Sequence, residues 1–262
     1  MPLFDAHNHL QASRILEALP DIMAGWERSG GKYLVCCGGD ESDWEDVLSL
    51  SRAYGQVITS FGVHPWYVRT LSPGWENTLV RYLETIPSAV GEIGLDFAIP
   101  DPNRDLQEAV FTRQLQIARE MNLPVSIHVR KAWEAVVRIL RQVGTLPARG
   151  LVHSYSGSAD MVPVLEKFGL MISFSGSITY PGNKKGIKAI GHVSGNNLLI
   201  ETDSPDIRPR VPETDGQVFN IPENLIHVAR AAAEARGSAL ESLIDQTHAN
   251  GTALFSSVLR IP

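Results

Sequence analysis

The stretch Phe4-Asp5-Ala6-His7-Asn8-His9 joins an apolar start to a His-x-His pair, and the fold can be worked out from it. If the stretch is a β-strand, alternate side chains share a face, so His7 and His9 point to the same side. Two imidazoles at this spacing can reach one zinc-like ion, because imidazole nitrogens bind such ions at about 2.0–2.1 Å. Alone, the pair is weak evidence, since two hydrogen-bonded histidines in a surface turn give the same pattern.

Four more candidate ligands lie in, or at the C-terminal end of, other apolar runs. These runs are Val90–Asp96 with Glu92, Val125–His128 with His128, Leu151–His153 with His153, and Leu199–Asp203 with Asp203. In barrel enzymes, the loops after the strands bring distant residues together at this end of the sheet. Imidazole and carboxylate groups inside a barrel need partners for their polar atoms. Metal ions would be such partners for these four residues and for His7 and His9 together. The sequence therefore predicts a metal site made of His7, His9, Glu92, His128, His153 and Asp203.

Short apolar runs alternate with amphipathic stretches along the chain, which is typical of βαβ units around a parallel sheet. We predict strands at Leu3–His9, Tyr33–Cys37, Val57–Val63, Ala89–Leu95, Pro124–Val129, Gly150–His153, Leu170–Phe174 and Leu198–Asp203. Helical patterns cover Ala12–Arg28, Ser42–Tyr54, Trp75–Ile86, Arg104–Met121, Ala132–Val143, Ala159–Phe168, Lys184–His192, Glu223–Arg236 and Leu240–Gln246. The prolines in Pro205–Pro222 favour a loop. Eight strands predict an α/β fold of the (β/α)8 TIM-barrel type.

The length and composition fit a single domain spanning residues 1–262, which we expect to be the metal-dependent hydrolase barrel. The chain is 44% hydrophobic and 20% charged, enough apolar material for a large core. No basic segment leads into an apolar run at the N-terminus, so we expect a cytoplasmic protein without a membrane anchor. The net charge of -6 argues against a broad basic surface, so phosphate binding should be local. The adjacent Cys36 and Cys37 point to opposite faces of a strand and are expected to be ordinary buried residues.

The number of candidate ligands predicts two metal ions, because a single catalytic zinc usually has three protein ligands. Our hypothesis is that His7, His9 and Asp203 hold one ion, His128 and His153 hold the other, and Glu92 spans both. Two ions about 3.5–4 Å apart suit in-line attack on phosphorus by a metal-activated water. Glu92 and Asp203 are therefore the predicted catalytic carboxylates. Imidazole and carboxylate ligands suit zinc, manganese, iron or nickel, and magnesium can support turnover in vitro, so the metal's identity is not predicted.

Four polar residues in or near the predicted site have two interpretations each. Asp203 could be a general base as well as a ligand, or a ligand only. His64 could orient a phosphate or a ligand, or be a turn histidine; Arg130 could bind a phosphate, or form a surface ion pair. Asp5 could fix an imidazole tautomer, or satisfy polar atoms of the core. Glu201, two residues before Asp203, faces the barrel interior and should have a partner there.

Five motifs, in order and spacing, resemble the TatD-type metal-dependent deoxyribonucleases of the amidohydrolase superfamily. They are Asp5-Ala6-His7-Asn8-His9, Gly62-Val63-His64-Pro65, Gly91-Glu92-Ile93-Gly94-Leu95-Asp96, Leu123-Pro124-Val125-Ser126-Ile127-His128-Val129-Arg130 and Glu201-Thr202-Asp203-Ser204-Pro205. The resemblance implies metal-dependent hydrolysis of DNA phosphodiester bonds, commonly from an end. One departure is Ser154, where the family usually has cysteine after the ligand histidine; it bears on pocket shape and substrate preference.

Two other functions compete with DNA hydrolysis. The same metals could hydrolyse an ester or amide, as in deacylation of mischarged tRNA, because an activated water can attack either centre. The barrel could also be a catalytically silent metal-binding module, although the presence of all six ligands argues against that. The expected partner is DNA or another phosphodiester, bound locally and without a membrane. The sequence does not predict the oligomeric state.

Overall fold

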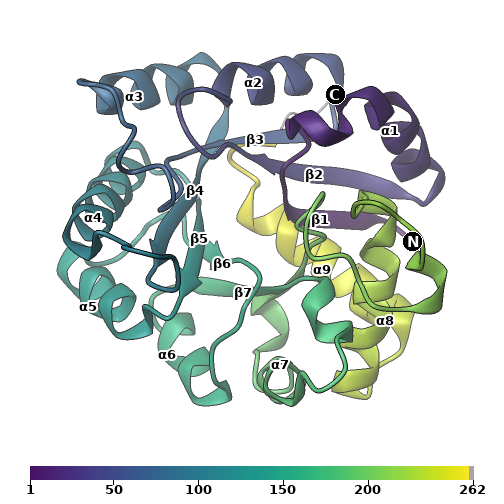
Figure 1. The fold of residues 1–262 in the computed structure, drawn as a ribbon. Coiled ribbons are helices and arrows are strands. Elements are labelled where there is room, and N and C mark those ends of the chain that lie inside the picture. The colour runs from purple at the N-terminus through teal and green to yellow at the C-terminus, as the bar shows by residue number, and fades with distance from the viewer. Residues whose placement is uncertain (260–262) are drawn as a thin grey trace.

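Eight parallel strands, in chain order, form the sheet in a computed structural model that describes residues 1–259. Each strand pairs with the next in parallel, from β1 with β2 to β7 with β8 (Figure 1). The strands are β1 Leu3–Asn8, β2 Gly31–Cys37, β3 Val57–Phe61, β4 Ser88–Asp96, β5 Val125–Arg130, β6 Gly150–Val152, β7 Leu170–Phe174 and β8 Leu198–Ile200.

Helices follow the strands and surround the sheet, as Figure 1 shows. They are α1 Leu19–Arg28, α2 Trp44–Ala53, α3 Trp75–Thr85, α4 Arg104–Met121, α5 Trp133–Val143, α6 Val162–Glu166, α7 Lys184–Ile190, α8 Leu225–Arg236 and α9 Leu240–Leu254. The predicted (β/α)8 TIM-type fold is confirmed. Among the helices of residues 1–259, none has the length and apolar character needed to cross a bilayer.

The predicted boundaries are wrong mainly where local geometry ends an element. β8 stops at Ile200 rather than Asp203, and Asp203 itself has a positive φ of 57°. The pattern Ala12–Arg28 is divided into a 3-10 turn, Ser13–Ala18, and α1, because Pro20 stands in the first turn of the α-helix, where it needs no amide hydrogen.

The last helix is longer than predicted: α9 continues to Leu254 instead of ending at Gln246. Asn250 donates from its side chain to the carbonyls of Gly195 and Leu198, which ties this extra segment to the sheet. Gly251 lets the helix approach the ring of Phe4, since a Cβ there would lie 2.5 Å from that ring. These contacts join residues far apart in the chain, so local periodicity did not predict them.

The first and last strands are joined by a buried carboxylate. Asp5 accepts hydrogen bonds from the backbone N–H of Thr202 at 2.8 Å and from its hydroxyl at 2.5 Å. Two backbone bonds add to this contact, from Asp203 to the carbonyl of His7 and from His9 to the carbonyl of Ser204. The barrel therefore closes beside the predicted ligands, and the closure fixes the positions of His7, His9 and Asp203.

Candidate metal centre

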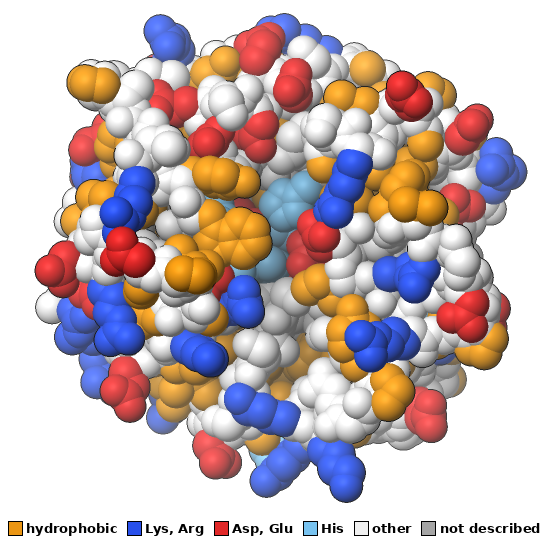
Figure 2. All heavy atoms as spheres, viewed as in Figure 1, with side chains coloured by type: hydrophobic (Ala, Val, Ile, Leu, Met, Phe, Trp, Pro, Cys, Tyr) orange, Lys and Arg blue, Asp and Glu red, His pale blue; other side chains and the backbone are white. Residues whose placement is uncertain are grey.

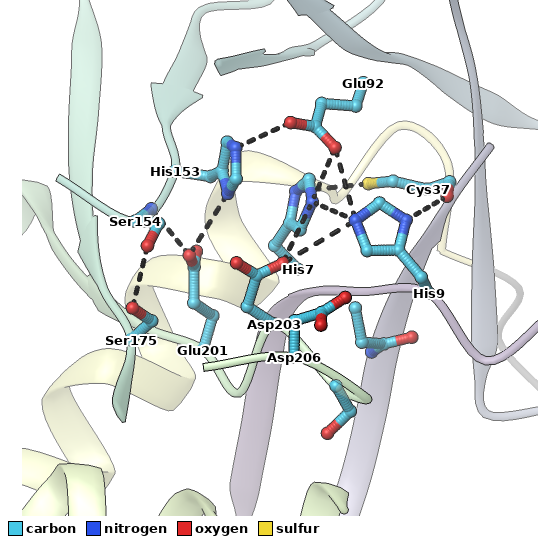
Figure 3. A network of polar contacts seen from close by, with 12 residues as sticks. His7, His9, Cys37, Glu92, His153, Ser154, Ser175, Glu201, Asp203 and Asp206 are labelled. Carbon is cyan, nitrogen blue, oxygen red and sulfur yellow. Dashed lines mark hydrogen bonds and ion pairs between the residues drawn. The ribbon is translucent and has the colours of Figure 1, made fainter. Parts of the chain in front are cut away.

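The six predicted ligands meet at the C-terminal ends of the strands. His7 is on β1, Glu92 on β4 and His128 on β5. His9 and His153 directly follow β1 and β6, and Asp203 lies three residues beyond the end of β8. Figure 3 shows five of them pointing toward one another, and Figure 2 shows histidine at the bottom of a hollow. All are buried except His9, which is partly exposed. The structure thus brings together every residue that the sequence predicted for this site.

Glu92 lies at the middle of the cluster, with its two carboxylate oxygens facing different imidazoles. Oε2 is 3.3 Å from Nε2 of His7 and 3.2 Å from Nε2 of His9. Oε1 is 2.8 Å from Nδ1 of His128 and 2.7 Å from Nε2 of His153. The carboxylate therefore stands between two pairs of imidazoles.

His64 also belongs to the cluster. The sequence interpretations placed it beside the ligands, as an orienting group or a turn residue. In the structure it is buried, its Nε2 lies 3.3 Å from Oε1 of Glu92, and it forms a possible metal-binding trio with Glu92 and His128. A usable signal was present, because His64 lies three residues beyond β3, as Asp203 lies three residues beyond β8.

The ring nitrogens that face away from the centre lie against polar groups, by hydrogen bonds at His7 and His9 and by ion-pair contacts with carboxylates at His128 and His153. Such partners fix the tautomer and orientation of an imidazole, as is common around metal ligands. The contacts are His7 Nδ1 to Ser126 Oγ at 2.8 Å, His9 Nδ1 to the Cys37 carbonyl at 2.8 Å, His128 Nε2 to Asp96 Oδ2 at 3.4 Å, and His153 Nδ1 to Glu201 Oε1 at 3.4 Å. Glu201 thus has the interior partner that the sequence predicted.

Asp203 lies beside the imidazoles of His7 and His9. Its Oδ1 is 3.6 Å from Nε2 of His9 and 3.9 Å from Nε2 of His7, and it forms another possible metal-binding trio with His7 and His153. The positive φ of Asp203 and the hydrogen bond from its N–H to the His7 carbonyl set the direction of this carboxylate. Its position fits either a ligand or a proton acceptor beside a ligand.

Asp5 and Arg130 lie around the cluster and contact other polar groups. Asp5 bonds to Thr202, to Asn8 and to the backbone N–H of His7, so its contacts correspond to polar satisfaction of the core. Arg130 pairs with the buried Asp96, with 3.3 Å between Nη1 and Oδ2, and its own side chain is about half exposed. The guanidinium is therefore anchored at one end and open to solvent at the rim of the site.

The electrostatics favour positive charge at the centre. Burial opposes ionisation of Glu92, but the nearby imidazoles of His153 and His64 outweigh it and hold the pKa of Glu92 well below its ordinary value. Burial likewise disfavours the charged form of His9, yet the hydrogen bond and charge of Glu92 raise its pKa to about 9. At His64, burial dominates and lowers the pKa to about 4, so the imidazole is neutral. Its Nδ1 accepts from the backbone N–H of Trp66, which leaves the hydrogen on Nε2, facing Glu92.

The donor set fits divalent metal ions. Nε2 of His7 and Nε2 of His9 are 3.3 Å apart, and Nδ1 of His128 and Nε2 of His153 are 3.1 Å apart. Two imidazole nitrogens on one tetrahedral ion, with bonds of about 2.0–2.1 Å, lie roughly 3.3 Å from each other. A further possible trio, His7 with His9 and Glu92, has its ligand atoms within 4.8 Å of one another. Both imidazole pairs are thus spaced for binding one ion each.

Known proteins with the same sequence pattern share this architecture. Residues 4–256 match the family model described as TatD related DNase. The chain is 29% identical to the Bacillus subtilis protein named uncharacterized metal-dependent hydrolase YabD, over 97% of this chain and 98% of that protein. It is 30% identical to the Salmonella typhimurium protein named 3'-5' ssDNA/RNA exonuclease TatD, over 98% of this chain and 100% of that protein.

A solved structure agrees with these matches. The crystal structure of YjjV, a TatD homologue from Escherichia coli, superposes with a TM-score of 0.90 at 26% identity, covering 99% of this chain and 98% of that one. The family match and the structural match both extend over nearly the whole length of the chain. The chain therefore belongs to the TatD related DNase family.

Proposed function

We propose that the protein is a divalent-metal-dependent hydrolase that cleaves phosphodiester bonds of DNA at a two-metal site, from a strand end. The observation that carries this proposal is the position of Glu92, whose two oxygens face separate imidazole pairs at 2.7–2.8 Å and 3.2–3.3 Å. A carboxylate in this position can bridge two cations. Pairs of divalent ions are typical of enzymes that cleave phosphate esters.

Each side of Glu92 supplies donors for one ion. In the proposal, His7, His9 and Asp203 would hold the first ion, and His128 and His153 would hold the second. His64 stands beside them with its Nε2 directed at Glu92. Bound divalent ions would neutralise the phosphate charge and activate a water molecule for in-line attack. The imidazoles keep their lone pairs directed inward because Ser126 and the Cys37 carbonyl hold the outer nitrogens of His7 and His9.

The remaining steps fall to side chains at the mouth. Asp203, whose Oδ1 lies 3.6 Å from Nε2 of His9, would accept the proton of the attacking water. Arg130 contacts a phosphate oxygen with the part of its guanidinium that Asp96 does not occupy. Substrate is held locally by these groups, which agrees with the acidic net charge of -6.

The substrate assignment is supported by the Salmonella relative, whose name includes single-stranded DNA and RNA exonuclease activity. The test is to incubate purified protein with end-labelled single-stranded DNA and manganese, zinc or magnesium, and to resolve the products on a gel. Glu92→Gln protein, purified in parallel, controls for contaminating nucleases, and chelator should stop the reaction. Shortening by single nucleotides supports the proposal. Inactivity on DNA together with cleavage of aminoacyl-tRNA esters would replace it with the deacylase function.

A further inference from the structure

An exposed tryptophan stands next to the metal centre. Trp66 is 52% exposed, whereas Trp26 and Trp44 are completely buried. It follows Pro65 in the loop after β3, two residues beyond His64. Figure 2 shows hydrophobic side chains directly beside the histidine-lined hollow. The next residue, Tyr67, is also exposed, so two aromatic rings stand in water beside the site.

The indole of Trp66 is held in a fixed orientation. Its ring N–H donates to Oδ2 of the fully buried Asp96 at 2.8 Å, and its backbone N–H donates to Nδ1 of His64 at 3.2 Å. The ring also stands edge-on to the His64 imidazole, with 4.9 Å between centroids and 90° between planes. The polar edge of the indole is thus satisfied inside the protein, while a large part of the ring stays open to solvent.

The same carboxylate oxygen positions a cation. Oδ2 of Asp96 also accepts from Nη1 of Arg130 at 3.3 Å, and the Arg130 side chain is 54% exposed. One buried oxygen therefore holds an aromatic ring and a guanidinium side by side at the rim. A planar apolar group next to an anion is the chemistry of a nucleotide, whose base stacks on aromatic rings and whose phosphate pairs with guanidinium.

We propose that Trp66 is a stacking platform for the nucleobase next to the scissile phosphate, and that Arg130 binds the phosphate of the same nucleotide. This inference rests on the proposed function, because it places the base relative to the metal centre. It adds a positioning residue for the substrate, because the base must leave its neighbours in order to stack on Trp66. Stacking of one base on an aromatic side chain changes affinity by about 5- to 150-fold.

The test is a double-mutant cycle between Trp66 and the base. Wild type, Trp66→Ala and Trp66→Phe are assayed on single-stranded oligonucleotides that carry an abasic residue at each of the terminal positions in turn. At one position, loss of the base should lower kcat/KM of the wild type by about 5- to 150-fold. Trp66→Ala should show a similar loss on the intact strand and no further loss on the abasic strand. Trp66→Phe should recover most of the activity, since it keeps a ring that can stack.

The outcomes separate the two proposals. Suppose that wild type cleaves DNA, but that Trp66→Ala lowers kcat/KM by the same factor on intact and abasic strands at every position. Trp66 then does not stack on a base, so the inference is wrong while the proposed function stands. If wild type cleaves no oligonucleotide, the proposed function fails and the inference fails with it. Thermal unfolding of both variants with bound manganese checks that each is folded.

Discussion

The hydroxyl oxygen of Ser126 lies 2.8 Å from Nδ1 of His7, on the opposite side of the imidazole from Nε2, which faces Glu92. Both side chains are fully buried, and they come from β5 and β1, on different sides of the barrel. Ser126 therefore orients a proposed ligand without reaching the centre itself.

Replacing Ser126 should weaken metal binding. In Ser126→Ala the outer nitrogen of His7 keeps only the Cys37 thiol, at 3.3 Å, as a nearby partner. Loss of such supporting groups lowers metal affinity by about 10- to 100-fold. Titration against a metal buffer measures the change. Ser173→Ala is the matched control, because that buried strand serine has no hydrogen-bond partner for its hydroxyl within residues 1–259. Equal affinities for the two variants would contradict the role of Ser126.

Asp203→Asn separates proton acceptance from metal binding. The amide keeps the size of the side chain and one oxygen but cannot take a proton. We expect turnover to fall by about 100-fold or more, as for loss of a general base, with metal content close to that of the wild type. Metal analysis of the same sample that is used for kinetics provides the check. Near-normal turnover at full metal content would exclude the base role of Asp203.

Arg130→Ala should raise KM for oligonucleotides more than it lowers kcat. The guanidinium stands at the rim beside Asp96 and is proposed to bind a phosphate in both ground state and transition state. Loss of one charge-assisted contact costs about 1.5–3 kcal/mol. Arg138→Ala is a suitable control, because Arg138 is similarly exposed but pairs with Glu108 between the outer helices α4 and α5. Identical KM changes in the two variants would argue for general electrostatic attraction instead.

Thr202→Val should destabilise the closure of the barrel. Valine preserves the shape but removes the hydroxyl that donates to Asp5 and accepts from Ser204. Removing one partner of a buried hydrogen-bonded pair costs about 1–3 kcal/mol, so the free energy of unfolding should fall by about 2 kcal/mol. Urea unfolding of metal-free protein measures it without a contribution from metal binding. Thr252→Val, which removes a buried hydroxyl with no partner in the described chain, should have little effect.

The barrel, and the meeting of polar side chains at the carboxyl ends of its strands, could be predicted from the sequence for a physical reason. Parallel strands place their carboxyl ends on one side of the sheet, so His7, Glu92 and His128 had to meet there once their strands were recognised. Elements with a regular pattern and clear stop signals, such as α4 and β7, were also located at their observed bounds.

Other features depend on contacts that no local pattern encodes. Ser126 looks like any other strand serine until the sheet closes and brings it to His7. Trp66 follows a His-Pro turn, and only the structure shows that Asp96 holds its ring at the rim. His64 lies three residues beyond β3, at the end of the sheet where the candidate ligands meet, so its place in the cluster follows from the same rule.

Glu92 is proposed to stand between two ions, and the metal content of the protein tests this most directly. Intact protein is saturated with manganese or zinc, freed of excess metal by gel filtration, and analysed for metal and protein in the same fractions. The arrangement predicts two ions per wild-type chain and fewer in Glu92→Gln, which replaces one carboxylate oxygen by a donor that repels a cation. One ion per chain in saturated wild type would contradict the two-metal site.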